Sequence, residues 1–366
     1  MAIRKRILPS GETRWLCDYR DGGGTRRFKQ FKTKKEAQVF SDKTGVDVRA
    51  GVHTADAASV TIRQAGELWL DRCRLDKLEA GTIRNYKQHL DLHIVKHIGA
   101  VKLSRLSKPD VGSFRDKILK TCSRSTATRV LVSLKSLLAD AQSRGLVAQN
   151  AATGVRVKAA SRHEKRVSIP TKDEIRAMIA KTSEWPTTSP WRPFVITALF
   201  TGLRPSELRG LVWDCVDFEK KTIRVRQRAD YQNTMGSPKS KAGTRDVPLA
   251  PMLLNTLRQW RLACSKTERG LVFPSKHGNI IGLAEPHRVW NRLLEALGLP
   301  RKSYRFYDLR HVAASLFIEQ GWQAKKVQAI MGHSSIQMTF DLYGHLWETP
   351  EDDAAAMAQI EARLLR

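Results

Sequence analysis

The chain has 366 residues, 41% of them hydrophobic, and contains no apolar run long enough to span a bilayer. It carries 64 lysines and arginines against 36 acidic residues, a formal net charge of +28. Such an excess attracts polyanions, and because no strongly amphipathic basic helix stands out as a membrane anchor, it favours nucleic acid as the partner. The basic N-terminus lacks the apolar stretch of a secretory signal, so we expect a cytoplasmic protein.

Residues 1–55 are predicted to form a small sheet followed by one helix. Three stretches have β character and are separated by glycine-containing turns: Ile3–Leu8, Arg14–Arg20 and Arg26–Phe31. A helical segment follows at about Lys34–Ala50. With 13 basic and 6 acidic residues, this three-stranded sheet and its helix have the charge to lie in a DNA groove. A solubilising appendage is the alternative.

Residues 51–59 have the small polar composition of a linker, and a helical pattern follows over residues 60–158. Four helices are predicted there: Ile62–Leu75, Ala80–Ile98, Lys108–Leu119 and Ser125–Arg144. We expect Ser125 or Thr126 to cap the start of the last helix and Gly145 to end it. The region holds 19 basic and 8 acidic side chains, more than solubility requires, which indicates a helical bundle with a basic face toward a DNA duplex. A merely solvated basic surface is the alternative.

A third domain is predicted over residues 165–366 and mixes helices with a small sheet. Its first elements are two helices and two antiparallel strands: Lys172–Thr182, Trp191–Gly202, Thr222–Gln227 and Arg245–Leu249. Helices dominate from Ala250 onward. The fold class expected for the whole chain is therefore mainly α with small β-sheets: a three-stranded sheet plus helix, a helical bundle, and a mixed α+β domain.

The tail from Glu348 to Arg366 changes from a basic to an acidic composition. Met357, Ile360 and Leu364 recur along it at helical spacing, which predicts a short helix with one apolar stripe. Such helices dock on other surfaces, and both packing within the chain and packing on a neighbouring subunit fit the pattern.

Cysteine and histidine usage gives no sign of a cross-linked or metal-binding framework. The five cysteines are scattered without CxxC spacing, and the ten histidines show no HExxH pattern. An odd number of dispersed thiols is typical of reduced side chains in a cytoplasmic protein. We therefore predict no disulfides, no structural metal and no cofactor.

The third domain contains the side chains that phosphodiester chemistry needs: Arg204, Lys241, Arg310, His333 and Tyr343. A guanidinium group can hold two phosphate oxygens at once, and a lysine can protonate a departing oxygen. A tyrosine hydroxyl can form a covalent phosphodiester, which retains the energy of the broken bond. We therefore expect a nicking-and-closing reaction that needs no ATP, rather than hydrolysis.

The order and contexts of these residues resemble the tyrosine recombinase, or phage integrase, family. Four segments carry the resemblance: TGLRPSELRGLVW (201–213), SKAGTRDVPL (240–249), YDLRHVAAS (307–315) and MGHSSIQMTFDLYGH (331–345). The match is distributed over the C-terminal half, so it is far more specific than any single short motif. It implies the mixed α+β catalytic domain of that family.

The resemblance implies a role for each matched residue. Arg204 and Arg310 would hold the phosphate from two sides. Lys241 would protonate the departing 5′ oxygen, and His333 would donate to a nonbridging oxygen. Tyr343 would be the nucleophile.

Position 307 departs from the family pattern, because Tyr307 stands where histidine is commonest. A phenol can still donate a hydrogen bond to phosphate, so Tyr307 is counted with the catalytic residues, but it carries a proton less readily than an imidazole at neutral pH. Tyr343 is preferred as the nucleophile because Tyr307 lies only three residues before Arg310. Lys239 is the alternative to Lys241.

Three further residues in the matched segments are expected to support the site rather than react. Glu207 would orient neighbouring groups, or it is simply an acid favoured at a helix N-terminus. His311 and His345 are expected to pack or orient helices.

The resemblance also implies an assembly on DNA. The helical and catalytic domains would clamp a core site from opposite sides, and the N-terminal module would bind arm-type sites. A homotetramer would exchange strands between two attachment sites through a Holliday junction, with a 3′-phosphotyrosine intermediate. A DNA-bending host protein and an excision-directing factor are implied partners, and the bacterial cytoplasm, at the nucleoid, is the implied location.

The expected function is therefore site-specific DNA recombination that integrates or excises a phage or mobile element. Two alternatives stay open. One is a chromosome-dimer resolvase, against which the extra N-terminal module argues. The other is a noncatalytic architectural DNA-binding protein, against which the retained phosphate-handling residues argue.

Overall fold

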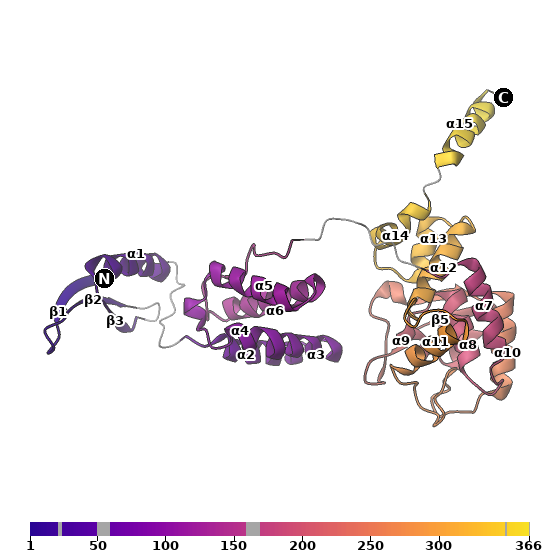
Figure 1. The fold of residues 1–366 in the computed structure, drawn as a ribbon, viewed down its shortest axis with the longest axis horizontal. Helices are drawn as coiled ribbons and strands as arrows, with labels where there is room; N and C mark the ends of the chain where they lie inside the picture. Colours follow the sequence, from indigo (N-terminus) through magenta and orange to yellow (C-terminus); the bar gives the residue numbers. More distant parts are fainter. Residues whose placement is uncertain (21–23, 50–58, 159–168, 348–349, 366) are drawn as a thin grey trace. The chain divides into compact units, whose positions relative to one another are not determined.

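The computed structural model describes residues 1–20, 24–49, 59–158, 169–347 and 350–365 (Figure 1). The chain divides into two compact units, residues 1–164 and 165–366. Most of the described chain is helical and its sheets are small, so the predicted fold class is confirmed. The domain ends predicted at residues 55 and 165 lie outside the described residues.

The first unit begins with an antiparallel sheet that has one helix packed on it. Its strands lie side by side in chain order: β1 (Ala2–Ile7), β2 (Thr13–Arg20) and β3 (Arg26–Phe31). Cys17 and Tyr19 of β2 are buried on the side of α1 (Lys34–Arg49), where the Tyr19 and Phe40 ring centroids lie 5.7 Å apart. Because side chains alternate between the two faces of a strand, the residues between them occupy the other face.

A helical bundle follows in the same unit. Its elements are α2 (Ile62–Leu75), α3 (Ala80–His89), the π-helical turn η1 (Leu90–Ile94), α4 (Val95–Ile98), the 3₁₀ turn η2 (Leu103–Arg105), α5 (Lys108–Thr121) and α6 (Arg124–Ser143). Helix α3, η1 and α4 follow one another without a break, which agrees with the single helix predicted over Ala80–Ile98. The four predicted helices are thus confirmed, with ends that differ by about two residues or fewer.

The start of α6 differs from the prediction. The helix begins at Arg124, and Ser123 caps it by accepting a hydrogen bond from the Thr126 backbone N–H at 3.2 Å. Ser125 and Thr126 lie inside the first turn, so their predicted role as caps was wrong. Gly145 follows the helix with a φ of 70°, as expected for its end.

The core of the bundle is apolar. Leu134 and Leu137 of α6 are buried in one cluster with Trp69 of α2 and Phe114 of α5. Each fully buried side chain of this kind contributes about 1.5–3 kcal/mol. The bundle is therefore held together by hydrophobic burial, and its basic residues remain available at the surface.

The second unit is built around α8 (Trp191–Thr201), which is buried along most of its length. Besides the tail helix described below, the other helices of the unit are α7 (Lys172–Ser183), α9 (Pro205–Arg209), α10 (Pro251–Ala263), α11 (Glu285–Ala296), α12 (Asp308–Glu319), α13 (Ala324–Met331) and α14 (Ile336–Tyr343). Four of them, α7, α9, α10 and α12, contact α8. The Phe194 ring of α8 lies 5.1 Å from that of Phe273 and 5.3 Å from that of Phe306, between centroids.

A small sheet lies in the same unit, in the order β4 (Val216–Asp217), β5 (Thr222–Val225) and β8 (Arg245–Pro248). Ile223 of β5 pairs with Val247 of β8, so the predicted antiparallel pairing is confirmed. The remaining short elements are β6 (Arg228–Ala229), β7 (Met235–Gly236), η3 (Trp213–Cys215), η4 (Lys241–Gly243) and η5 (Gly344–Leu346).

The predicted tail helix is present as α15 (Pro350–Leu364). Met357, Ile360 and Leu364 are all exposed on it. Docking of this stripe within the chain or on a neighbouring subunit stays a prediction.

Three composition-based expectations concern thiols, metals and membranes. Each of the five cysteines, all of which are described, is a free thiol. Within the described ranges, no group of His, Cys, Asp and Glu side chains is placed to hold a metal ion. No helix in that part of the chain combines the length and the apolar character needed to cross a membrane.

Candidate active site

The first arginine segment forms a tight turn between two helices. Helix α8 ends at Thr201, and Gly202 adopts the left-handed conformation, with a φ of 61°, that redirects the chain. A Cβ at Gly202 would come within 2.9 Å of the Met331 sulfur, so glycine also allows this close approach. Arg204 then takes the N-cap position of α9, with Pro205 in its first turn. The turn therefore fixes the position of Arg204 at the start of α9.

The Arg204 guanidinium group is held on two sides. Nη1 donates to Glu207 Oε1 at 2.8 Å, and Nη2 donates to the Gly332 carbonyl oxygen at 2.8 Å. The side chain remains 31% exposed. Helix α9 is anchored at its other end by Arg209, whose buried Nε donates to the Ile281 carbonyl oxygen at 2.6 Å. Arg204 can therefore offer its remaining N–H groups to an anion without losing its orientation.

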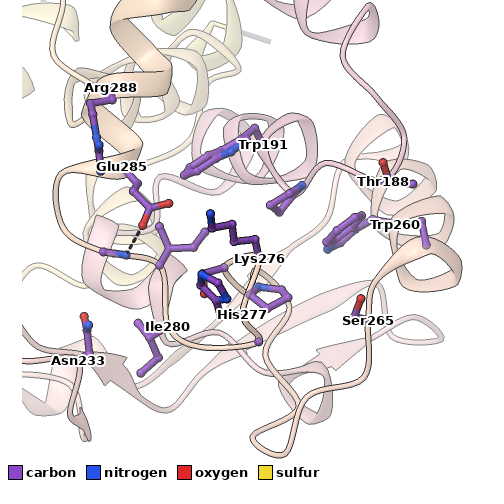
Figure 2. A pocket seen from close by; sticks show the side chains of 17 residues that line it. Thr188, Trp191, Asn233, Trp260, Ser265, Lys276, His277, Ile280, Glu285 and Arg288 are labelled. Atoms are coloured by element: carbon purple, nitrogen blue, oxygen red, sulfur yellow. Dashed lines mark hydrogen bonds between the residues drawn. The ribbon is translucent and has the colours of Figure 1, made fainter.

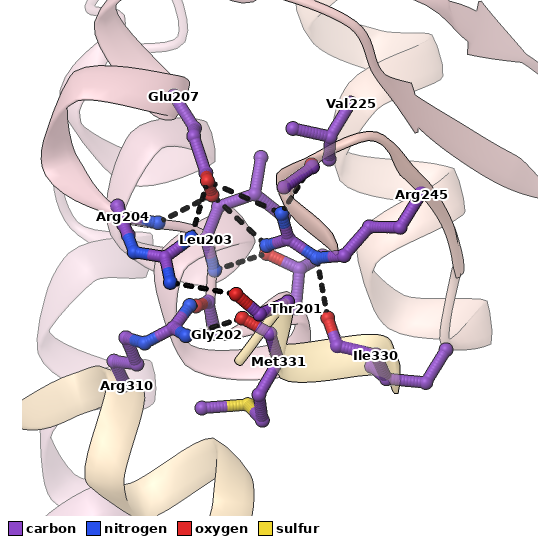
Figure 3. A network of polar contacts seen from close by, with 12 residues as sticks. Thr201, Gly202, Leu203, Arg204, Glu207, Val225, Arg245, Arg310, Ile330 and Met331 are labelled. Atoms are coloured by element: carbon purple, nitrogen blue, oxygen red, sulfur yellow. Dashed lines mark hydrogen bonds and ion pairs between the residues drawn. The ribbon is translucent and has the colours of Figure 1, made fainter. Parts of the chain in front are cut away.

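Glu207 is a buried carboxylate between two arginines (Figure 3). Arg245 donates to it twice, from Nη1 to Oε1 at 3.1 Å and from Nη2 to Oε2 at 2.9 Å. Burial alone would raise the pKa of Glu207, but the hydrogen bonds and charge of Arg245, with the charge of Arg204, lower the pKa to about 2. The carboxylate is therefore ionised at neutral pH and orients both guanidinium groups.

Arg245 is a part of this group that sequence reasoning missed. It is buried at the start of β8 and also donates from Nε to the Ile330 carbonyl oxygen at 2.5 Å, which joins β8 to α13. Its signal was the alternation of the strand: Arg245 and Val247 are buried, whereas Asp246 between them is exposed. A cation at an inward position indicates a buried acid as its partner.

Arg310 lies on α12 and is only 3% exposed. Its two terminal nitrogens donate to the carbonyl oxygens of Gly202 and Met331. Burial, and then the nearby charge of Arg204, lower the pKa of Arg310 to about 10, so it is still a cation at neutral pH. Both effects disfavour the charged form of Arg310, and the negative charge of an anion bound beside it would favour that form.

Three of the motif segments meet at the turn formed by Met331 and Gly332. Arg310 donates to the Met331 carbonyl oxygen and Arg204 to that of Gly332. Gly332 has a φ of 64°, which ends α13 and brings the following residue, His333, back toward the arginines. The two arginines and the histidine of the sequence prediction are thus brought together.

His333 is buried behind this turn. Its Nδ1 lies 2.9 Å from the Thr339 hydroxyl. Burial, and then the charges of Arg310 and Arg204, lower the pKa of His333 to about 4, so the ring is neutral at neutral pH. When Nδ1 accepts from Thr339, Nε2 carries the proton and becomes a hydrogen-bond donor.

Tyr343, at the end of α14, is buried beside the same group. Its ring stacks on that of His333, with 11° between the ring planes, and its Oη lies 2.7 Å from His311 Nδ1. Burial raises the pKa of Tyr343 despite the opposing charge of Arg310, so the hydroxyl is protonated at neutral pH. The predicted nucleophile therefore lies in the same unit as the predicted phosphate-binding side chains and next to them.

The other two predicted site residues lie at the edge of this group. Tyr307 immediately precedes α12, is 38% exposed, and has its ring centroid 5.7 Å from that of His311. Lys241 is exposed at the start of η4. The next residue in η4, Ala242, has its carbonyl oxygen 2.9 Å from where a Cβ on Gly332 would lie. Both residues are thus solvent-exposed neighbours of the buried group.

The second unit also has a cavity of about 690 Å³ that does not coincide with this group (Figure 2). Trp191, Lys276 and Arg288 are among the side chains that line it, and none of the six predicted site residues is. The group of arginines, histidine and tyrosine is therefore the candidate active site.

Sequence comparison relates this unit to a known protein family. Residues 170–349 match the sequence profile of the phage integrase family. The chain belongs to this family. It is a tyrosine-type site-specific DNA recombinase, and the enzyme class predicted from the order of its residues is confirmed.

Relatives match the recombinase over most of its length. A tyrosine recombinase XerC-like protein of Caldanaerobacter subterraneus subsp. tengcongensis is 26% identical, over 89% of this chain and 90% of that protein. The ICEBs1 integrase of Bacillus subtilis is 23% identical, over 88% of this chain and 89% of that protein. The recombinase is thus similar both to a XerC-like protein and to an integrase.

Solved structures share the fold of the recombinase. The Tn1549 transposon integrase in complex with a circular intermediate DNA has a TM-score of 0.71 at 19% identity, covering 82% of this chain and 100% of that chain. A lambda integrase dimer bound to a COC′ core site has a TM-score of 0.60 at 17% identity, covering 94% and 96%. A lambda integrase tetramer bound to a Holliday junction has a TM-score of 0.58 at 17% identity, covering 92% and 96%.

Proposed function

We propose that the recombinase cuts and rejoins attachment-site DNA through a 3′-phosphotyrosine linkage at Tyr343. The proposal rests on the grouping of Arg204, Arg310, His333 and Tyr343 around one turn of the chain. Attack on a phosphodiester needs a nucleophile, donors for the charge that develops on the phosphate, and a proton for the leaving oxygen. Residues of all three kinds lie within or beside this group.

The two arginines bind the nonbridging oxygens of the scissile phosphate. Glu207 and backbone carbonyl groups already hold their guanidinium groups in place, so little reorganisation is needed when the charge develops. His333 donates from Nε2 to one of the same oxygens. Tyr307, at the edge of the group, donates its hydroxyl proton to the phosphate in a hydrogen bond and does not react.

In the cleavage step, Tyr343 Oη forms a bond to phosphorus as the bond from phosphorus to the 5′ oxygen breaks. Lys241 gives a proton to the departing 5′ oxygen. Rejoining is the reverse reaction with a 5′ hydroxyl from the partner strand. The phosphotyrosine bond stores the energy of the original linkage, so neither ATP nor another cofactor is required.

The N-terminal sheet supports binding to arm-type DNA sites. Arg6 pairs with Arg14 across β1 and β2, and Asp18 pairs with Phe28 across β2 and β3, so these side chains share the face opposite to α1. Phe28 is exposed there. A face that combines arginines with an exposed aromatic ring suits the groove of a duplex.

We infer that the three regions bind different parts of the DNA. Residues 1–55 bind arm sites, and residues 60–158 and 165–366 bind the core site. Four copies act on two sites, as the lambda integrase tetramer on a Holliday junction supports. A DNA-bending host protein and an excision-directing factor assist at the nucleoid of a bacterial cytoplasm. The basic N-terminal sheet favours integration or excision of a phage or mobile element over chromosome-dimer resolution.

A suicide substrate with a nick near the crossover tests the proposal, because loss of the short strand traps the covalent intermediate. We expect a denaturation-resistant protein–DNA adduct that forms without metal, is absent in Tyr343→Phe, and persists in Tyr307→Phe. Both substitutions remove only a hydroxyl group, so they are matched. An adduct that survives Tyr343→Phe would refute the assignment of the nucleophile, and no adduct with the parent chain would favour the architectural alternative.

A further inference from the structure

The proposed chemistry gives no role to the imidazole of His311. This residue follows Arg310 on α12, is 7% exposed, and places Nδ1 2.7 Å from Tyr343 Oη. The two side chains come from helices that are separated by α13 in the chain, and both are buried. The tertiary fold therefore places the His311 imidazole against Tyr343 Oη, the atom that would attack the phosphate.

The protonation states of the two groups allow Tyr343 to donate this hydrogen bond. Burial lowers the pKa of His311, so the ring is neutral and has one nitrogen with a free lone pair. The buried phenol of Tyr343 is protonated, as its raised pKa requires. A neutral imidazole nitrogen accepts strongly, and a hydroxyl hydrogen rotates toward such an acceptor. When Nε2 carries the ring proton, His311 Nδ1 accepts the hydrogen bond from the Tyr343 hydroxyl.

We propose that His311 is the proton acceptor for Tyr343 when the tyrosine attacks the DNA phosphate. This inference rests on the proposed role of Tyr343 as the nucleophile. The Oη–H bond breaks and its proton moves to Nδ1, while the Oη–P bond forms and the P–O5′ bond breaks. The 5′ oxygen takes its own proton from Lys241, on the leaving side. In the rejoining step the imidazolium returns its proton to Oη.

The surroundings of His311 fit a brief positive charge. Asp308, one turn earlier on α12, favours the charged ring, whereas Arg310 and Arg305 oppose it. The phosphate that Arg310 would bind adds negative charge to the same site during the reaction. The His333 ring, which is stacked on that of Tyr343, is neutral and its Nδ1 contacts Thr339, so it does not compete for the phenolic proton.

The position of Tyr307 adds to this inference. It occupies the position, three residues before Arg310, at which histidine is commonest in the family. Its ring lies against that of His311, one helical turn further on. The His311 imidazole therefore lies beside position 307, with its Nδ1 toward the nucleophile rather than toward solvent.

Two substitutions separate proton transfer from simple positioning. His311→Ala removes the acceptor, and His311→Asn keeps an oxygen acceptor near the Nδ1 position that cannot take up a proton. We expect both full-length variants to form the adduct at least about 100-fold more slowly than the parent, in line with the loss of a general base. Retained core-site binding and an unchanged unfolding midpoint of His311→Asn control for folding.

A second substrate locates the defect on the nucleophile side. In a suicide substrate whose scissile 5′ oxygen is replaced by sulfur, the leaving thiolate needs no proton. Lys241→Ala should recover on this substrate, whereas both His311 variants should remain slow. A parental rate in His311→Asn would show that only positioning matters, and recovery of a His311 variant on sulfur would place it on the leaving side. Faster cleavage in His311→Ala would show that the contact is an inhibitory lock.

Each of those three results would overturn the inference while leaving the nucleophile assignment intact. The proposed function has its own test, because Tyr343→Phe must abolish the adduct on both substrates. If it does not, Tyr343 is not the nucleophile, whatever the His311 variants do.

Discussion

The helical bundle and the active-site unit handle their charges in opposite ways. Within residues 59–158, every charged side chain is at least partly exposed and the core is apolar. Ion pairs there, such as Arg74 with Asp71, lie at the surface, where one pair contributes about 0–1 kcal/mol. In the second unit, Arg245, Arg310 and Glu207 are buried and fixed by specific partners. DNA can be attracted by the number of charges, but chemistry at one phosphorus requires charges at fixed positions.

The largest effect on the rate of adduct formation should follow from replacing a charged side chain that specific partners hold in place. Arg310→Lys keeps the charge but loses the two-sided hold on the Gly202 and Met331 carbonyl groups, so adduct formation should fall by about 100-fold or more. The rate on the nicked substrate measures this. Arg301→Lys, at an exposed arginine of the same unit, is the matched control and should keep the parental rate. Equal losses in the two variants would contradict the distinction between fixed and interchangeable charges.

The buried acid should matter for stability as well. Glu207→Gln keeps the side-chain shape but leaves Arg245 buried without its counter-charge, at an expected cost of about 3 kcal/mol in the free energy of unfolding. Urea unfolding followed by tryptophan fluorescence measures it. The control is Glu184→Gln, which removes an exposed acid paired with Lys181 and should change stability by less than about 0.5 kcal/mol. A cost as small as that of the control would show that the Glu207 charge is not required.

The same carboxylate predicts sensitivity to acid. Its pKa is lowered from 4.5 to about 2 in the folded chain, so its stabilising contribution is complete above pH 4.5 and is lost as the pH falls toward 2. The lowering corresponds to about 3 kcal/mol. Unfolding free energies of the parent and of Glu207→Gln should therefore converge as the pH is lowered through this range. A gap that stays constant between pH 5 and pH 2 would argue against an ionised Glu207.

A smaller effect on chemistry is expected from removing the N-terminal region altogether. Deleting residues 1–55 should abolish bridging between a core site and a distant arm site, because the arginine-bearing face of the sheet is lost. Cleavage at the core site should persist. Bridging can be followed by the looping of a DNA that carries both sites. Unaltered bridging would support the appendage alternative for this region.

The smallest effect, a change in the affinity for DNA, is expected from removing one exposed charge of the helical bundle. Lys120 is exposed on α5, and Lys120→Ala should weaken core-site binding only slightly and equally for all sequences. If Lys120 contacts a phosphate, the slope of log affinity against log salt should become shallower by about 0.9. Fluorescence anisotropy over a salt series measures both quantities. A change in preference between matched and altered core sites would show instead that this lysine reads bases.

Local structure was largely predictable from the sequence. Both ends of α2 were predicted, because its apolar spacing is a local property. The cap of α6 was not, since Ser123, Ser125 and Thr126 all carry suitable hydroxyl groups and only the path of the preceding turn selects among them. In the active site, the resemblance of four segments to the tyrosine recombinase family indicated the arginines and the tyrosine. Arg245 was missed because its role depends on Glu207, an acid 38 positions earlier in the chain that only the tertiary fold brings against it.

By itself, the sequence determined the order of the elements, the charge of +28 and the side chains able to act on a phosphate. These properties depend on residue type and on neighbours a few positions away. Only the tertiary structure decided that Arg204 meets a carbonyl oxygen 128 residues further along, and that the Tyr343 hydroxyl meets His311. Such contacts depend on how α8, α12, α13 and α14 pack around a shared core, and no local spacing contains that information.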